Sequence, residues 1–114
     1  MKEKKTAGAD LKVKDLLAMY YFMKLTREFE NRCIKLYRQG KIPGRLLTGT
    51  GSEAISVGSA YTLENGDVLM PLHRDLGAVF VRGETAKMMM CQFMAKKGGL
   101  TQGRDLDMHC GNRK

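Results

Sequence analysis

Three neighbouring side chains, His73, Arg74 and Asp75, bring together an imidazole, a guanidinium and a carboxylate. They follow a short apolar run at residues 68–70, which we expect to form a buried strand that ends at a proline, because proline has no N–H for a neighbouring strand. A second apolar run, residues 76–81, predicts a helix directly after them. Ionisable groups between a buried strand and a helix are where α/β proteins hold anionic ligands. The sequence therefore predicts an anion-binding site at this turn.

Arg74 is the cation of this turn that we single out. A guanidinium presents a planar fork of donors that suits phosphate and carboxylate groups. An unpaired guanidinium buried at a strand end would be costly, so an ion pair with Asp75 or Asp67 is the purely structural alternative. The sequence alone leaves both interpretations open.

Two other patterns carry less weight. Residues 49–54 match the Gly-x-Gly-x-x-Ala form of the dinucleotide fingerprint, but no clear strand precedes them, which favours a flexible start of a helix over a nucleotide site. The two histidines and three cysteines fit no closed zinc pattern, and His109 and Cys110 are adjacent, which rarely lets both side chains reach one metal ion. We therefore predict no metal ligands in this chain.

The composition limits the class of protein. With 114 residues the chain forms at most one domain, and its formal charge of +8 suits an anionic partner. Nucleic acid is disfavoured, because the aromatic residues lie on apolar stripes and not among the basic residues. No apolar run approaches the ~20 residues of a membrane span, and three well-separated cysteines indicate a reducing compartment, so we expect a cytoplasmic protein. A small basic helical module that binds an acidic protein or nucleic acid, without catalysis, stays open as the alternative function.

The first part of the chain divides into a tail and a long helix. Residues 1–12 are rich in lysine and should form a disordered basic tail. Apolar residues at steps of three and four predict a helix over residues 13–39. Its wide apolar face needs a larger partner surface than the rest of the chain supplies.

Two shorter helices should flank the charged turn. The spacing of Thr50 and Glu53 is that of a capping box and predicts a helix over residues 52–62. A methionine-rich segment predicts another helix over residues 85–95, in which the methionines fill a core or a subunit contact. A polar, glycine-rich loop follows from residue 96.

The order of these segments resembles that in one protein family. The motifs that carry the resemblance are, in order, Arg27-Glu28-Phe29-Glu30, Leu36-Tyr37-Arg38-Gln39-Gly40, Gly51-Ser52-Glu53-Ala54, His73-Arg74-Asp75, Arg82-Gly83, and Gly103-Arg104 with Met108-His109. The family is the α subunit of thiamine-diphosphate-dependent 2-oxo acid dehydrogenases, of the pyruvate, acetoin and branched-chain types. The resemblance covers nearly the whole chain from about residue 10.

The resemblance implies a fold and a function. The fold is α/β, and residues 13–114 would be an incomplete N-terminal portion of a thiamine-diphosphate-binding domain, mostly helical with one or two short strands. The implied reaction is the oxidative decarboxylation of a 2-oxo acid, followed by transfer of the acyl group to a lipoyl group. The implied partners are a β subunit, in an α2β2 assembly, and a lipoyl-bearing acyltransferase.

The resemblance also implies roles for particular side chains. The residues implied to bind the cofactor's diphosphate are Leu72, His73 and Arg74. The residues implied to act in catalysis are His73 and His109. The residues implied to contact the substrate are Arg45, Leu106, Asp107, Met108 and His109.

Two departures from the family pattern matter. Many members have His-Gly where this chain has Leu76-Gly77, so one proton carrier is missing here. The family's Gly-Asp-Gly…Asn segment, which binds magnesium and the diphosphate, is not found in these residues, so the magnesium ligands are expected outside them. We therefore expect this chain alone to be inactive and to lack tight cofactor binding.

Overall fold

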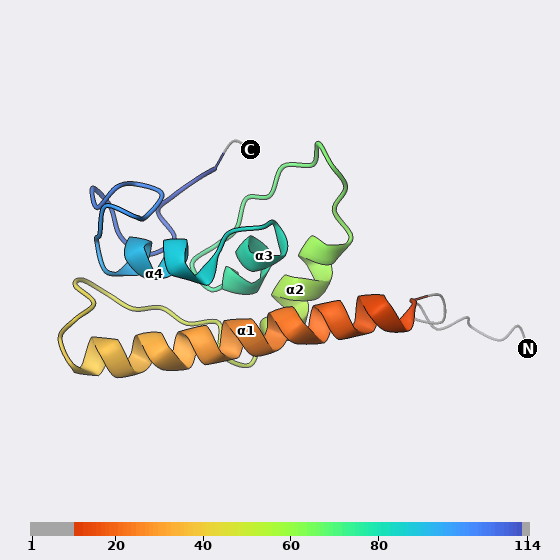
Figure 1. Cartoon of the computed structure of the whole chain (residues 1–114), viewed down its shortest axis with the longest axis horizontal. Helices are drawn as coiled ribbons and strands as arrows, with labels where there is room; N and C mark the ends of the chain where they lie inside the picture. Colours follow the sequence, from red (N-terminus) through yellow and green to blue (C-terminus); the bar gives the residue numbers. More distant parts are fainter. Residues whose placement is uncertain (1–10, 113–114) are drawn as a thin grey trace, which may run out of the picture.

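Helices make up the regular structure of this chain. A computed structural model describes residues 11–112, and within this range the chain forms four helices and no strand. The helices are α1 (Val13–Arg38), α2 (Glu53–Tyr61), α3 (Leu76–Val81) and α4 (Ala86–Phe93). Figure 1 shows α1 running along one edge of the molecule, with the other three helices on the same side of it. The expected helices at all four places are confirmed, whereas the expected basic tail falls almost entirely outside the described residues.

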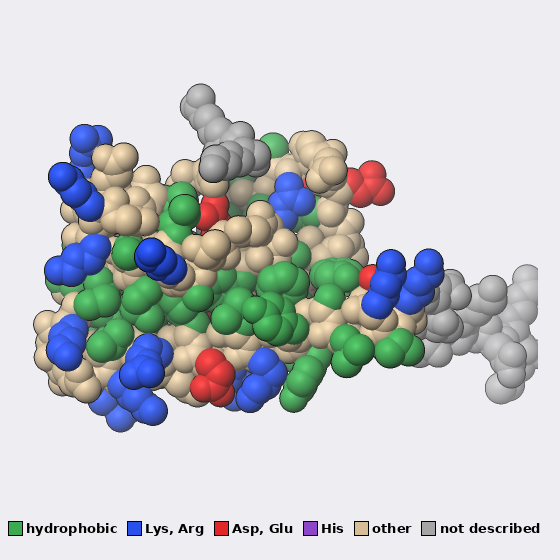
Figure 2. All heavy atoms as spheres, viewed as in Figure 1, with side chains coloured by type: hydrophobic (Ala, Val, Ile, Leu, Met, Phe, Trp, Pro, Cys, Tyr) green, Lys and Arg blue, Asp and Glu red, His purple; other side chains and the backbone are tan. Residues whose placement is uncertain are grey.

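The long helix α1 follows the predicted apolar stripe. Phe29 and Cys33 belong to the buried core, and Phe22, Leu25 and Leu36 pack against it. The N-terminal half of α1 instead leaves large apolar side chains exposed, and Figure 2 shows apolar side chains along this helix. Although α1 has 26 residues, neither it nor any other helix within residues 11–112 is apolar enough to cross a membrane.

Aromatic contacts join α1 to two of the short helices. The ring of Phe29 meets Phe80 of α3 and Phe93 of α4 edge to face, with ring centroids 5.3 and 5.7 Å apart. This is the geometry that aromatic quadrupoles favour. The core is therefore centred on the middle of α1.

Gly77 lets α3 lie close against α1 and α2. A Cβ atom built at Gly77 would lie 2.5 Å from Ser56 Oγ, 2.9 Å from Val57 Cγ2 and 3.2 Å from Thr26 Oγ1. Two helices can approach this closely only where one of them has no side chain. This contact fixes the start of α3, directly after the charged turn.

Two local expectations are wrong. Residues 68–70 form no strand, and Val68 and Met70 are 83% and 87% exposed, because no other segment among residues 11–112 lies alongside to complete a ladder of hydrogen bonds. The capping box is not formed either: α2 begins after Ser52 without a side-chain cap, and the Thr50 hydroxyl donates to Glu30 instead. The α/β class stays a prediction.

Candidate functional site

The charged turn is closed by its own acidic residue. The Leu72 N–H donates to Asp75 Oδ2 at 2.9 Å, and the Asp75 N–H donates to the Leu72 carbonyl at 3.0 Å. The Arg74 side chain is exposed and has no carboxylate within ion-pair distance in residues 11–112. The alternative of an ion pair with Asp75 or Asp67 is therefore not realised there, which leaves the guanidinium fork available to a ligand. Leu72 is also exposed, at 74%.

The loop between α1 and α2 supports the backbone of this turn. A Cβ atom at Gly49 would overlap the carbonyl oxygen of Arg74, so only glycine fits at this contact. Glu30, on α1, holds the loop in place: its carboxylate accepts the Gly49 N–H at 2.7 Å and the Thr50 hydroxyl at 2.9 Å. Glu30 is only 3% exposed, and these charge-assisted bonds compensate for its burial.

A second carboxylate holds the next part of the same loop. Glu53 accepts a hydrogen bond from Arg27 Nε at 2.6 Å and also accepts the Gly51 N–H. The bond from Arg27 lowers the pKa of Glu53 to about 2, although burial acts in the opposite direction. Arg27, Glu30 and the start of α2 thus form one rigid junction. The sequence predicts Glu53 only as a member of a capping box with Thr50 and assigns no separate role to Glu30; the signal for both contacts is an acid on the buried face of a helix.

His73 and Asp107 meet from distant parts of the sequence. His73 Nδ1 lies 3.7 Å from Asp107 Oδ2, which is within ion-pair distance but too long for a hydrogen bond. Asp107 is 8% exposed, and burial raises the pKa of its carboxyl, an effect that the charge of His73 partly offsets. A residue predicted to bind the cofactor thus lies beside one predicted to bind the substrate, and the roles of both stay predictions.

His109 completes this cluster. Its ring lies edge to face against that of His73, with centroids 4.8 Å apart, and its Nδ1 is 3.3 Å from Asp105 Oδ1. The pKa of Asp105 is lowered, chiefly by the hydrogen bond from the Leu106 N–H and also by His109. Both imidazoles are partly exposed and each faces a different carboxylate, an arrangement suited to proton transfer.

Gln92 of α4 anchors the loop that carries Asp107 and His109. Its side chain is completely buried, its Nε2 donates to the Asp105 carbonyl at 3.2 Å, and its Oε1 accepts the Thr101 N–H and hydroxyl at 3.0 and 2.9 Å. Gln92 is not among the site residues predicted from the sequence. The signal for this role is the position of Gln92, a polar residue on the apolar face of a methionine-rich helix.

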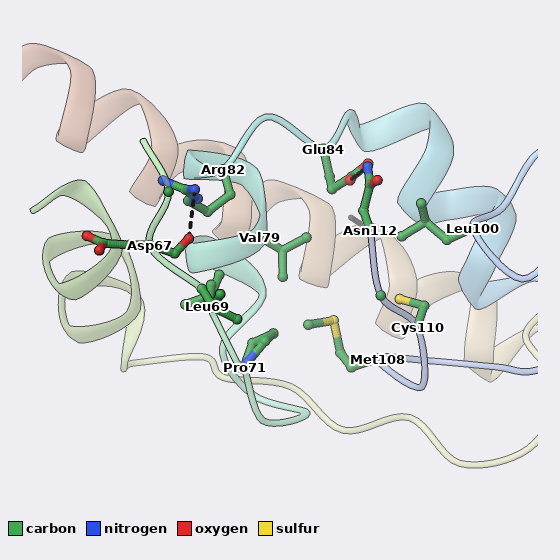
Figure 3. Close-up of a pocket in the computed structure, with 13 residues that line it drawn as sticks. Asp67, Leu69, Pro71, Val79, Arg82, Glu84, Leu100, Met108, Cys110 and Asn112 are labelled. Atoms are coloured by element: carbon green, nitrogen blue, oxygen red, sulfur yellow. Dashed lines mark hydrogen bonds between the residues drawn. The ribbon is translucent and has the colours of Figure 1, made fainter. Parts of the chain in front are cut away.

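A cavity of about 560 Å³ lies between residues 66–71 and 108–112 (Figure 3). Its walls are apolar at Val79, Leu100 and Met108, and polar at Arg82 and Glu84. Arg82 is already engaged, because its Nη atoms donate to the carbonyls of Asp67 and Glu64 at 3.3 and 3.4 Å. The cavity is mainly an apolar gap between two irregular segments.

Comparison with known proteins places this arrangement in a family. Residues 21–114 match the family described as "Dehydrogenase E1 component". The chain belongs to the dehydrogenase E1 component family. This E1 chain is 34% identical over 109 residues to the α subunit of acetoin:2,6-dichlorophenolindophenol oxidoreductase of Bacillus subtilis (strain 168). The alignment covers 96% of this chain and 33% of that protein.

Two further relatives have other names. The pyruvate dehydrogenase E1 component subunit alpha of Rhizobium meliloti (strain 1021) is 34% identical, covering 89% of this chain and 29% of its own length. The 2-oxoisovalerate dehydrogenase subunit alpha of Bacillus subtilis (strain 168) is 38% identical, covering 84% of this chain and 29% of its own. This E1 chain therefore spans about a third of the length of these relatives, and matches the N-terminal part of the subunit.

The remaining predicted site residues are spread more widely over the E1 chain. Arg45 is exposed. Within residues 11–112, no hydrogen bond or ion pair joins its side chain to the histidines. Leu106 points towards the loop before Arg45, since a Cβ atom at Gly44 would lie 3.0 Å from Leu106 Cδ1. Met108 is 7% exposed and belongs to the core, so its exposed surface is small. Their substrate contacts stay predictions.

The residues of the turn suit a diphosphate. Arg74 has an exposed guanidinium without an ion-pair partner among residues 11–112, and the ring of His73 beside it is partly exposed. The guanidinium fork is the donor that a doubly charged anion would engage. No group of three or more His, Cys, Asp or Glu side chains within residues 11–112 is placed to hold a metal ion.

Proposed function

We propose that this chain is the N-terminal part of the α subunit of a thiamine-diphosphate-dependent 2-oxo acid dehydrogenase. The complete enzyme would decarboxylate a 2-oxo acid oxidatively and transfer the acyl group to a lipoyl group. Membership of the E1 family and three relatives that are α subunits support this proposal. The observation that carries it is the free guanidinium of Arg74 on a backbone that Gly49 and Glu30 hold in place.

The cofactor would lie against the charged turn. Arg74 would bind a diphosphate oxygen through its fork, His73 would contact the cofactor through Nε2, and the exposed side chain of Leu72 would cover apolar surface beside them. When bound, thiamine diphosphate supplies an electron sink for the carbanion that decarboxylation leaves. The magnesium ion that accompanies the diphosphate would take its ligands from outside the residues described.

The substrate would contact the two histidines. His73 and His109 each face a carboxylate and have exposed ring surface, so both can accept and return a proton. The other side chains that we propose to line this end of the site are Arg45, Leu106, Asp107 and Met108. Among them Arg45 offers the positive charge that would attract a substrate carboxylate.

The assembly and location follow from the same proposal. A β subunit would complete an α2β2 enzyme within an α/β fold, and a lipoyl-bearing acyltransferase would accept the acyl group. The exposed apolar side chains of α1 are available to such partners. The three cysteines are unpaired, which supports a reducing compartment such as the cytoplasm.

Cofactor affinity tests the proposal. In the complete α subunit with its β partner, Arg74→Ala should raise the dissociation constant for thiamine diphosphate at least tenfold, roughly 1.4 kcal/mol, in calorimetry. Arg38→Ala, an exposed arginine in the last turn of α1, is the control and should leave the constant unchanged. An unchanged constant for Arg74→Ala would contradict the assignment. Binding of an acidic partner that falls steeply with salt and ignores Arg74→Ala would favour the non-catalytic module.

A further inference from the structure

One oxygen of a buried carboxylate among residues 11–112 lacks a hydrogen-bond partner. It is Asp107 Oδ1, which is inaccessible to solvent, and His73 Nδ1 is likewise buried without a hydrogen-bond partner there. The nearest approach between the two side chains is the 3.7 Å from His73 Nδ1 to Asp107 Oδ2. Burial of an unsatisfied carboxylate costs free energy, so its presence calls for an explanation.

The backbone at Asp107 adds to this cost. Asp107 has a φ of +54°, in the left-handed region, which is unfavourable for a residue with a Cβ atom. Aspartate tolerates this conformation better than most residues. Gln92 fixes the loop two residues before Asp107 through the Asp105 carbonyl. The loop thus holds the carboxylate inside the protein and against His73, in spite of the strain.

The other groups around the pair do not satisfy Asp107. His109 lies edge-on to the His73 ring, but its own Nδ1 faces Asp105 at 3.3 Å. His73 is therefore the one ring that Asp107 can pair with among the described residues, and a small side-chain rotation would bring Nδ1 and Oδ2 to hydrogen-bond distance.

We propose that Asp107 is a positioning residue that sets the tautomer of His73. The carboxylate accepts a hydrogen bond from the N–H at His73 Nδ1, which leaves Nε2 with a free lone pair. Nε2 then accepts a proton from a ligand group, the resulting imidazolium is stabilised by Asp107, and the same proton returns from Nε2 in the reverse step. The use of this proton acceptor in catalysis rests on the proposed function, whereas the tautomer itself does not.

The experiment reads the tautomer directly. The chain contains only two histidines, so ¹⁵N-labelled histidine gives two ring systems in a long-range ¹H–¹⁵N spectrum, and His109→Gln assigns them. At about pH 8, where imidazole is neutral, His73 should be mainly the Nδ1–H tautomer in the wild type. In Asp107→Asn the Nδ1–H form should become the minority, because the amide can donate to Nδ1.

Matched variants separate positioning from packing. Asp105→Asn should change the signals of His109 and leave the tautomer of His73 as in the wild type. Asp107→Glu retains the carboxylate and should restore part of the Nδ1–H population. A wild-type His73 in the Nε2–H form, or one whose tautomer ignores Asp107→Asn, would overturn the proposal. Neither result depends on cofactor affinity, so the Arg74→Ala measurement tests the proposed function separately.

Discussion

Glu30 and Asp107 are both buried carboxylates beside the same turn, but their surroundings differ. Glu30 is 3% exposed and accepts two short hydrogen bonds, from Gly49 and Thr50, whereas Asp107 is 8% exposed and its Oδ1 has no donor among residues 11–112. A carboxylate with a donor at each oxygen supports structure. A buried carboxylate oxygen without a donor carries a cost in free energy, which a functional role would explain. The two acids therefore hold the backbone of Arg74 and the ring of His73 by different means.

The largest effect should come from the contact that Glu30 supports. Gly49→Ala places a methyl group on the Arg74 carbonyl, so the loop and the turn must separate, and the free energy of unfolding should fall by about 3 kcal/mol. Gly58→Ala, within α2 and with no atom near its built Cβ, should instead raise it by about 0.5–1 kcal/mol. Urea unfolding of both variants measures these changes in the free energy of unfolding. Equal changes for Gly49→Ala and Gly58→Ala would show that the contact between Gly49 and Arg74 is not tight.

Removal of the charge of Glu30 should also destabilise the chain. Glu30→Gln replaces one of two charged acceptor oxygens by an amide nitrogen, so the Gly49 N–H or the Thr50 hydroxyl loses its partner, at about 2 kcal/mol. Glu28→Gln alters only a surface pair with Lys24 and should cost less than about 0.5 kcal/mol. If Glu30→Gln and Glu28→Gln have equal urea midpoints, Glu30 does not stabilise the loop at Gly49 and Thr50.

Glu53 should make the free energy of unfolding depend on pH. Its pKa is about 2 in the folded chain, below its ordinary value of 4.5, so its contribution to stability is complete above pH 4.5 and is lost as the pH falls towards 2. Glu53→Gln should therefore lower the free energy of unfolding by about 1.5 kcal/mol at pH 7 and have little effect near pH 2. Thermal melts at both pH values test this, and a loss independent of pH would exclude the Arg27 pair as the cause.

Asp107 should behave in the opposite way, with the smallest change. Its pKa is raised above 3.8 in the folded chain, so its contribution to stability is present below that value and lost as the pH rises through the folded pKa. Asp107→Asn should thus leave the free energy of unfolding unchanged or increase it by about 0.5–1 kcal/mol at pH 7, with no gain near pH 3. A clear loss at pH 7 would make Asp107 a support like Glu30.

The helices and the charged turn could be predicted because their signals are local. The stripe through Phe22, Phe29 and Cys33 has helical spacing, and Gly40 ends α1 with a φ of +70°, which glycine adopts most easily. The pairing of His73 with Asp107 could not be derived from spacing. It depends on a loop without periodicity, and its position is set by Gln92 from another helix.

The errors have a common physical cause. The pattern of Val68 and Met70 suits a strand, but a strand exists only with a neighbour, and none is present among residues 11–112. Thr50 has the spacing of a capping residue, whose hydroxyl would accept an N–H from the first turn of the helix. Its hydroxyl instead donates to the buried carboxylate of Glu30, because a charged acceptor forms the stronger hydrogen bond. In both cases the outcome depends on residues distant in the sequence, which are absent beside Val68 and Met70 and present beside Thr50.

The rotational register of α1 has a consequence for how this chain tolerates changes of length. Thr26, Arg27 and Glu30 lie within little more than one turn, and they meet α3, α2 and the loop at Gly49 respectively. Each residue of an α-helix advances by about 100°, so an insertion between Thr26 and Glu30 would rotate one part of this face away from its partners. An insertion near Leu17, where side chains are exposed, would leave all three contacts in place.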